Sequence, residues 1–182
     1  GRFVEALIAP DFDDEALEYL QHKSRNIRLL RLRREPQPAR SGRVVRQITG
    51  GWLVQDRDVD LIAQWYSPTA ATFPEEKKPL AEFGVKACKH VKSNAIVLVR
   101  EYEPGCFALL GMGAGQPNRV DAVRKLAVSK ARENIEELMK ERESYGQNPQ
   151  EVTSHIMGEA VLVSDAFFPF PDNIQHAAEA GI

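Results

Sequence analysis

Short apolar runs and amphipathic segments alternate along the first part of the chain. Residues 3–9 are mostly apolar and stop at Pro10, which predicts a buried strand. Asp13 and Asp14 can cap a following helix that carries one apolar stripe. Residues 26–32 predict a second strand of the same kind. The chain is therefore expected to open as a β-α-β unit.

A polar excursion, a hairpin and a helix are expected next. Residues 33–46 are rich in Arg and Pro and predict a surface excursion that leads into a short strand. The glycine pair at residues 50–51 marks a turn before a strand at residues 52–55. Apolar residues at helical spacing predict a helix over residues 75–90, although Gly84 lowers its intrinsic helix propensity.

The middle of the chain predicts a hairpin followed by a long helix. Residues 96–100 and 107–110 are apolar strands joined by a turn at residues 104–105. The Gly-rich residues 111–116 predict a turn that opens the helix, whose distal part is charged and solvent-facing. The buried face of that helix is marked by Val120, Val123, Ala127 and Ala131.

The last part of the chain predicts a loop, a core strand and a short helix. Residues 144–150 form the polar loop, residues 160–163 the strand and residues 174–180 the helix. Residues 181–182 resemble the start of another strand, so we expect a C-terminal piece to be missing. The pattern as a whole predicts a three-layer α/β domain without internal repeats.

Composition narrows the function classes. The 182 residues, 43% hydrophobic and 27% charged, are those of a soluble globular protein. A net charge of -2 provides no overall basic field, which argues against a dedicated nucleic-acid binder. The apolar runs fall far short of the roughly 20 residues that cross a bilayer, so we expect no membrane association. Two cysteines and no signal peptide predict a reducing, cytoplasmic setting.

The glycine-rich residues 111–116 are the first candidate for ligand binding. They join a strand to a helix, where free backbone N–H groups favour an anionic or polar ligand. Gln116 replaces the third glycine of a dinucleotide-binding loop, and a tight structural turn is an equally good interpretation. Arg119 lies in the first helical turn, where the dipole disfavours a cation unless it has a partner such as a ligand carboxylate, a carboxamide or an Asp.

The segment at residues 165–173 is more informative. Three phenylalanines and two prolines surround two aspartates after a core strand, which is too apolar for an ordinary surface loop. Core packing beneath a helix capped by Asp172 or Asn173 is the first interpretation. The alternative is an aromatic pocket wall for a flat heterocycle, with Asp172 accepting hydrogen bonds from ring N–H groups.

A polar junction at residues 89–94 holds further candidates. Lys89 and His90 could serve acid/base chemistry, but adjacent helical side chains diverge, so we favour a solvated pair. Asn94, which enters a strand, is the better candidate for a fixed polar contact. We expect no metal site, because Cys88 and His90 cannot converge on zinc from i and i+2.

These segments together resemble a known family of purine biosynthesis. The matching stretches are residues 3–10, 50–58 and 91–97, then Gly-Ala-Gly-Gln-Pro-Asn-Arg-Val at 113–120 and Ser-Asp-Ala-Phe-Phe-Pro-Phe-Pro-Asp at 164–172. In this order they resemble the formyltransferase region of the bifunctional 5-aminoimidazole-4-carboxamide ribonucleotide (AICAR) formyltransferase/IMP cyclohydrolase family.

The resemblance implies a fold and an activity. The fold would be a three-layer α-β-α, cytidine-deaminase-like fold without the zinc site. Residues 1–70 would be the linker and the N-terminal β-α-β part of the formyltransferase region. Residues 71–182 would be its second cytidine-deaminase-like subdomain, truncated at the C-terminus. The family transfers a formyl group from the co-substrate 10-formyltetrahydrofolate to the 5-amino group of AICAR.

The resemblance also implies roles for individual residues. Asn94 would be catalytic and orient the AICAR carboxamide and the formyl group, and Asp165 would help to hold a monovalent cation. Phe167, Arg119 and Val120 would bind the nucleotide substrate. The folate pterin would be bound by Pro169, Phe170, Asp172 and Asn173.

Departures from the family pattern limit the expected activity. In the family, the catalytic Lys-His pair belongs to the first copy of the fold. Lys89-His90 aligns with the second copy, where the corresponding pair is not catalytic. The cyclohydrolase domain is missing, and the loop at residues 132–159 is longer than is common. We therefore expect a half-site that works with a homodimer partner or the missing half of the transferase. The alternative is a relative or partner subunit that binds folate or nucleotide without turnover.

Overall fold

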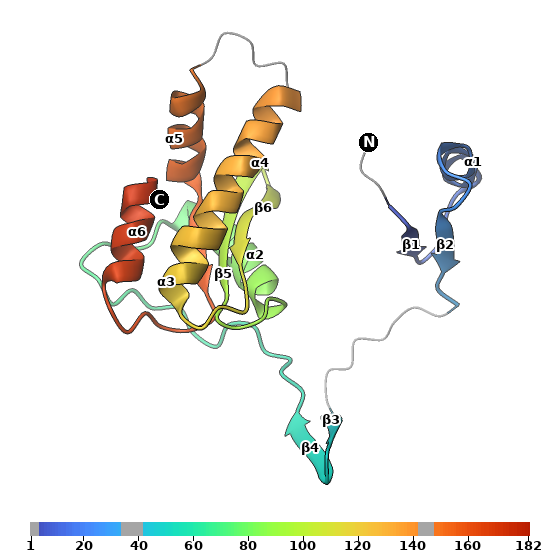
Figure 1. The fold of residues 1–182 in the computed structure, drawn as a ribbon, viewed down its shortest axis with the longest axis horizontal. Helices are drawn as coiled ribbons and strands as arrows, with labels where there is room; N and C mark the ends of the chain where they lie inside the picture. Colours follow the sequence, from blue (N-terminus) through green and yellow to red (C-terminus); the bar gives the residue numbers. More distant parts are fainter. Residues whose placement is uncertain (1–3, 34–41, 142–147) are drawn as a thin grey trace. The chain divides into compact units, whose positions relative to one another are not determined.

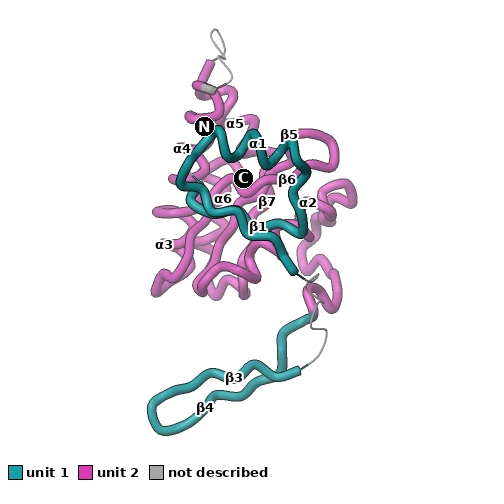
Figure 2. Tube along the Cα trace, turned by 90° about the vertical axis from the view of Figure 1, so that its right-hand side faces the viewer, with its two compact units in different colours: residues 1–59 teal, residues 60–182 magenta. Residues whose placement is uncertain are grey.

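The computed structural model describes residues 4–33, 42–141 and 148–182 and contains two compact units. Unit 1 comprises residues 1–59 and unit 2 residues 60–182 (Figure 2). The sequence-based division at residue 70 therefore lies inside the second unit. Most of the expected Arg- and Pro-rich excursion, residues 34–41, lies outside the described residues.

Unit 1 begins with the expected β-α-β unit. Strands β1 (Ala6–Ala9) and β2 (Arg28–Arg31) are parallel neighbours joined by helix α1 (Asp14–Lys23). Asp13 caps that helix, because its carboxylate accepts a hydrogen bond from Ala16 N at 2.7 Å. The prediction of buried strands was wrong, since no described residue of unit 1 is buried. Two strands and one helix cannot enclose both faces of a sheet.

Unit 1 ends in an antiparallel hairpin. Strand β3 (Arg43–Ile48) pairs with β4 (Gly51–Asp56) through a tight turn, as the sequence predicted. Gly50 has φ +85° in that turn, a conformation that glycine adopts without a Cβ clash.

Unit 2 is built on a three-stranded antiparallel sheet. The strand order is β6-β5-β7, with β5 (Ile96–Glu103) between β6 (Cys106–Gly113) and β7 (Val161–Ser164) (Figure 1). The predicted hairpin and core strand are confirmed. Residues 96–99 of the central strand are fully buried, which indicates that both faces of the sheet are covered.

Helices cover the two faces of this sheet. On one face lies α2 (Lys78–Lys89), which continues from the 3-10 turn η1 (Glu75–Lys77). On the other face, a continuous helical run is formed by α3 (Arg119–Asp121), the π-helical η2 (Ala122–Ala127) and α4 (Val128–Glu141). Helices α5 (Pro149–Glu159) and α6 (Asp172–Ala180) complete that layer (Figure 1). The α/β class is therefore confirmed.

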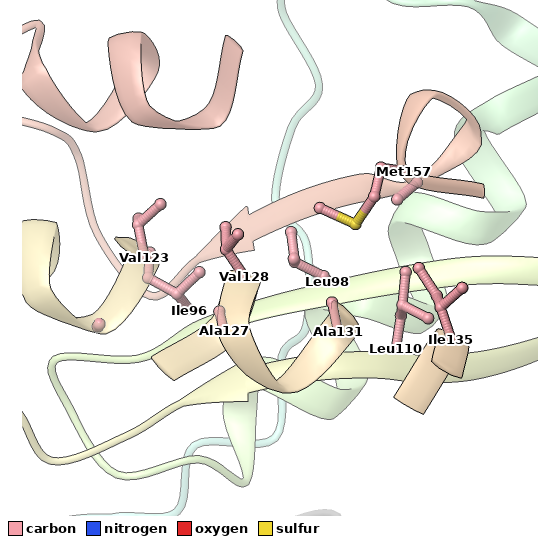
Figure 3. Packing of buried hydrophobic residues seen from close by; sticks show 11 residues of the cluster. Ile96, Leu98, Leu110, Val123, Ala127, Val128, Ala131, Ile135 and Met157 are labelled. Carbon is pink, nitrogen blue, oxygen red and sulfur yellow. The ribbon is translucent and has the colours of Figure 1, made fainter. Parts of the chain in front are cut away.

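Alternation along β5 separates two apolar clusters. Ile96 and Leu98 point to the face covered by η2 and α4, where they pack with Val123 and Ile135 (Figure 3). Their neighbours on β5, Val97 and Val99, point to the face covered by α2 and pack there with Leu80, Ala81 and Cys88. Val123, Ala127 and Ala131 are buried as predicted, whereas Val120 is half-buried.

Three glycines let helices approach the sheet closely. A Cβ on Gly84 in α2 would lie 2.7 Å from Val163 Cγ2. A Cβ on Gly111 would collide with the carbonyl oxygen of Ala127, and one on Gly113 with that of Ala122. Residues 111 and 113 belong to β6 rather than to a turn, so the turn predicted at residues 111–116 begins later in the chain.

Two further predictions near the C-terminus were wrong. The loop expected at residues 132–159 contains the end of α4 and all of α5, which Asn148 caps by accepting from Gln150 N at 3.0 Å. Residues 144–147 of the predicted polar loop lie outside the described residues. Gly181 and Ile182 do not begin a strand: Gly181 has φ +89° and closes α6, with Ile182 N donating to Ala177 O at 3.0 Å.

Within the described part of the chain, no helix has the length and apolar character that a membrane span requires.

Candidate functional site

The candidate site lies at one end of the unit 2 sheet. Ile96, the first residue of β5, is opposite Gly113 at the end of β6 and Ser164 at the end of β7. The connections that enter β5 and leave β6 and β7 therefore gather at the same edge of the sheet. Most of the candidate site residues from the sequence analysis lie in these connections.

Asp165 joins these connections. Its Oδ1 accepts a hydrogen bond from Ala95 N at 3.2 Å and another from Arg119 Nη2 at 3.0 Å. Its Oδ2 accepts from Ser93 Oγ. The backbone N–H of Asp165 in turn donates to Ala95 O at 3.2 Å. A single carboxylate thus binds the segment before β5 and the first residue of α3.

The charges at Asp165 affect its own acidity and that of a buried thiol. Partial burial alone would raise the pKa of Asp165, but the hydrogen bonds from Ser93, Ala95 and Arg119 and the guanidinium charge lower it overall. Burial and then the nearby Asp165 charge raise the pKa of Cys88 to about 11, against the opposing effect of Arg119. The carboxylate is therefore ionised at neutral pH, whereas the thiol keeps its proton.

Arg119 has the partner that its position requires. Of the three kinds of partner expected for a cation in a first helical turn, the structure shows an aspartate, Asp165. The side chains of Arg119 and Asp165 are only 19% and 18% exposed. Arg119 Nε is buried without a hydrogen-bond partner among the described residues. Val120 follows it, half-buried, in α3, and Asn118 caps the helix by accepting from Asp121 N at 2.8 Å.

Asn94 is held by the loop that leaves β6. Its Nδ2 donates to Gln116 O at 2.9 Å and to Pro117 O at 3.1 Å. The same two loops are joined where Gly115 N donates to Lys92 O at 2.8 Å. The Ser93–Asn94 peptide bond is cis. The expectation of a fixed polar contact at Asn94 is confirmed, and its side-chain oxygen is left to accept from a ligand.

The aromatic segment after Asp165 divides between the core and the surface. Phe168 packs against the apolar cluster on the α4 face. Phe167 is 81% exposed and Phe170 67% exposed, and Pro169 is also exposed. Core packing therefore accounts for one of the three rings, and the other two are free to form part of a binding surface.

Asp172 and Asn173 begin α6. Neither is the N-cap, which is Pro171, so the expected capping role was wrong. The carboxylate Oδ1 of Asp172 accepts from Asn173 N at 2.8 Å and from Asn173 Nδ2 at 2.9 Å. Asn173 is 3% exposed, and its Oδ1 is buried without a partner among the described residues. Helix α6 packs against α3 and η2, which brings this pair to the same side of the sheet as Val120.

The remaining predicted positions are the Lys89-His90 pair and the candidate ligands of a metal ion or cation. Lys89 and His90 are exposed at the end of α2, and Lys89 Nζ donates to Asp60 O at 2.8 Å. In the described ranges, no group of three or more His, Cys, Asp or Glu gathers to hold a metal ion. A monovalent cation at Asp165 would have to share the carboxylate with the Arg119 guanidinium. We therefore assign a cation no role in the reaction.

A cavity of about 180 Å³ lies at the N-terminal end of α2, whereas the candidate site lies near its C-terminal end. Trp65 and Phe73 stack in its wall with their ring centroids 6.2 Å apart. Its volume is below the roughly 300–1,000 Å³ of typical small-molecule pockets. We assign it no role.

The site therefore contains an amide oxygen, a fixed guanidinium, a carboxylate beside a buried amide, and exposed aromatic rings. Such groups can orient a polar, flat ligand, although none of these contacts shows a catalytic role. Sequence reasoning missed Ser93 and the carbonyl groups of Gln116 and Pro117. Only the unfavourable position of Arg119 pointed to an anion nearby.

Fold and site together define an α/β domain with a polar and aromatic site at one sheet edge. Residues 1–130 match the family described as "AICARFT/IMPCHase bienzyme", and the chain belongs to this family.

Relatives named "Bifunctional purine biosynthesis protein PurH" match over nearly the whole chain. The relative from Lactobacillus delbrueckii subsp. bulgaricus is 37% identical over 99% of this chain, and that from Lactobacillus acidophilus is 40% identical over 99%. The relative from Rhodopirellula baltica is 39% identical over 100%. The chain spans about 30% of the length of each of these relatives.

Proposed function

We propose that this chain supplies the folate and nucleotide half-site for formyl transfer from 10-formyltetrahydrofolate to the 5-amino group of AICAR, a step of purine biosynthesis. Family membership and the relatives' names support this proposal. The observation that carries it is the convergence of Asn94, Arg119 and Asp165 at one sheet edge, followed by exposed aromatic rings. The helices on both faces of the sheet are compatible with a cytidine-deaminase-like fold.

The chemistry of the transfer explains why these groups are suitable. The 5-amino group is a poor nucleophile, so the reaction needs proton removal and a stabilised tetrahedral oxyanion. In the proposal, both N–H groups of the Asn94 side chain are engaged, so its Oδ1 accepts from the N–H of the AICAR carboxamide. Asn94 thereby orients the nucleotide relative to the formyl group. Arg119 and Val120 face the substrates, and the exposed ring of Phe167 stacks near the imidazole.

The folate would lie along the start of α6. Pro169 and the exposed ring of Phe170 supply an apolar surface for the pterin. Asp172 has one oxygen engaged by Asn173 and would use the other for ring N–H donors. Asn173 Oδ1, which is buried and has no partner among the described residues, would be a further acceptor on the same helix where the bound pterin reaches it.

Two consequences concern partners. The general acid/base pair of the transfer would come from outside this chain, because Lys89-His90 corresponds to a pair that is not catalytic in the family and Lys89 Nζ donates to the backbone carbonyl of Asp60. The chain, alone or as a homodimer, would therefore transfer the formyl group only together with the half of the transferase that carries this pair. A binding module without turnover is the second candidate function, and the hydrogen bond of Lys89 Nζ to the backbone carbonyl of Asp60 is the observation that favours it.

The substitution Asp172→Asn tests the folate half of the proposal. The variant keeps the shape of the side chain but removes its charge, so we expect reduced-folate affinity to fall about 10- to 100-fold. The melting temperature should change little, because the Asn oxygen can still accept from Asn173 N. Calorimetric titration of the purified chain with 5-formyltetrahydrofolate, a stable reduced folate, measures the affinity.

Glu179→Gln is the matched control, because Glu179 is exposed at the far end of α6 and pairs with His176. That variant should bind folate as the unmodified chain does. Equal folate affinity for Asp172→Asn and Glu179→Gln, or a sharp fall in melting temperature for Asp172→Asn alone, would contradict a pterin-binding role for Asp172.

A further inference from the structure

Asp165 connects two groups that the proposed transfer needs but that lie in different segments. Arg119 begins α3 and follows β6, whereas Ser93 and Ala95 flank Asn94 in the loop before β5. The carboxylate contacts all three of these residues. It is thus the point at which the Asn94 loop and the start of α3 are held to each other.

Arg119 depends on this carboxylate for its orientation. A cation at a helix N-terminus is disfavoured by the helix dipole, and the Asp165 charge offsets that cost. Among the described residues, the guanidinium donates a hydrogen bond to Asp165 alone, and its Nε is buried without a partner. Without the carboxylate, the side chain would be free to turn toward solvent or toward a bound anion.

Asn94 depends on the same carboxylate through its neighbours. The residues on each side of it donate to Asp165, one through a hydroxyl and one through the backbone. Its own side chain is then turned toward the carbonyl groups of Gln116 and Pro117. The direction of the free amide oxygen is therefore set by the anchored loop and not by Asn94 alone.

We infer that Asp165 is a positioning residue: its carboxylate fixes the Asn94 loop and the Arg119 guanidinium in one arrangement relative to each other. That this arrangement serves formyl transfer rests on the proposed function. The coupling of Asn94 and Arg119 through Asp165 does not depend on the proposed function. The positioning role and the proposed function can therefore be tested separately.

The coupling is measured by nuclear magnetic resonance on the ¹⁵N-labelled chain without ligand. In Asp165→Asn, the Arg119 side-chain resonance should shift toward that of a free guanidinium. The side-chain amide of Asn94 and the backbone amide of Ala95 should exchange with solvent about tenfold faster, the change that loss of a typical hydrogen bond gives. The amides of Leu98 and Val99 in the same strand should keep their protection.

Asp121→Asn is the matched control, because Asp121 is also a carboxylate of α3 and pairs with Arg124 and Lys125. That variant should leave the Asn94 and Arg119 signals unchanged. Ser93→Ala is a milder second variant that removes one donor and keeps the charge pair. It should speed exchange at Asn94 while the Arg119 resonance stays in place.

Unchanged Asn94 and Arg119 signals in Asp165→Asn, or unchanged Asn94 exchange in Ser93→Ala, would overturn the positioning role. If Asp165→Asn loses its fold, Ser93→Ala decides whether the carboxylate anchors the Asn94 loop. The proposed function is judged separately, by folate and AICAR titrations of the unmodified chain. The positioning role can therefore stand where substrate binding fails.

Discussion

At the scale of single residues, the Asp165–Arg119 pair affects more than the groups it touches. Cys88 is buried beneath it at the end of α2 and is 3% exposed. Burial and the Asp165 charge both disfavour a second negative charge there, which is why the pKa of the thiol rises to about 11. The thiol is therefore a natural probe of this charge environment.

We expect Cys88 to react slowly with thiol reagents at neutral and mildly alkaline pH. A thiol with a pKa of about 11 is deprotonated to roughly one part in a thousand at pH 8, and only the thiolate attacks. Reactivity should rise with pH toward about 11 as the proton is lost. Labelling a Cys106→Ser variant, in which Cys88 is the remaining thiol, measures this directly.

A second variant, Cys88→Ser, provides the comparison, because Cys106 is only partly buried on β6. Its thiol should be labelled faster in the folded chain, and denaturant should make the two variants alike. Rapid labelling of Cys88 at pH 8 in the folded state would contradict the structure around Asp165.

The sequence could predict the polar groups of the site but not the network that joins them. Arg119 at a helix start required an anion, and Asp was one of three alternatives that local reasoning left open. The actual partner lies 46 residues further along the chain and arrives through the pairing of β7 with β5. Spacing along the chain carries no information about such a contact.

At the scale of elements, close packing of helices on the unit 2 sheet depends on small residues. Gly84 lies between α2 and the sheet, and Gly111 and Gly113 lie beneath η2 and α4. Gly84 has a low helix propensity, so its presence inside a helix is explained by packing and not by local preference.

Gly84→Ala tests that explanation. The added methyl would lie 2.7 Å from Val163 Cγ2 and 3.1 Å from Val99 Cγ2, an overpacking that costs about 1–3 kcal/mol. Alanine also returns about 1 kcal/mol of helix propensity, so we expect a net loss of about 0–2 kcal/mol in the free energy of unfolding. Urea denaturation of the chain provides the measurement.

Gly158→Ala is the matched control within α5, where the nearest atom to an added Cβ is Gly181 O at 3.6 Å. This variant should be unchanged or more stable by up to about 1 kcal/mol. If both variants gain stability equally, Gly84 is not needed for the contact between α2 and the sheet.

Element prediction succeeded where pattern and local chemistry agreed. The continuous apolar run at residues 96–99 and the helical spacing of Val123, Ala127 and Ala131 marked the core correctly. Element prediction failed where tertiary contacts override the local preference of the sequence. Gly111 and Gly113 were assigned to a turn because a glycine-rich run usually breaks a strand, whereas here the helix above requires the missing Cβ atoms. Gly181 was assigned to a strand although glycine commonly ends a helix in this conformation.

At the scale of the whole chain, the sequence is short compared with its named relatives. The chain covers about 30% of its named relatives, and the described residues of unit 1 expose large apolar side chains such as Trp52 and Leu53. A two-stranded hairpin of this kind is marginally stable by itself in water. In the proposed function, the chain is one half of a shared site, and unit 2 carries the residues proposed to bind substrate.

The most direct test of this account is to supply the purified chain with AICAR and 10-formyltetrahydrofolate and to follow folate binding and tetrahydrofolate release in the same sample. The account predicts saturable folate binding without release, because the acid/base pair lies outside this chain. Sustained release that Lys89→Ala or His90→Ala abolishes would contradict the half-site, and the absence of saturable folate binding would contradict the assignment of the folate site to this chain.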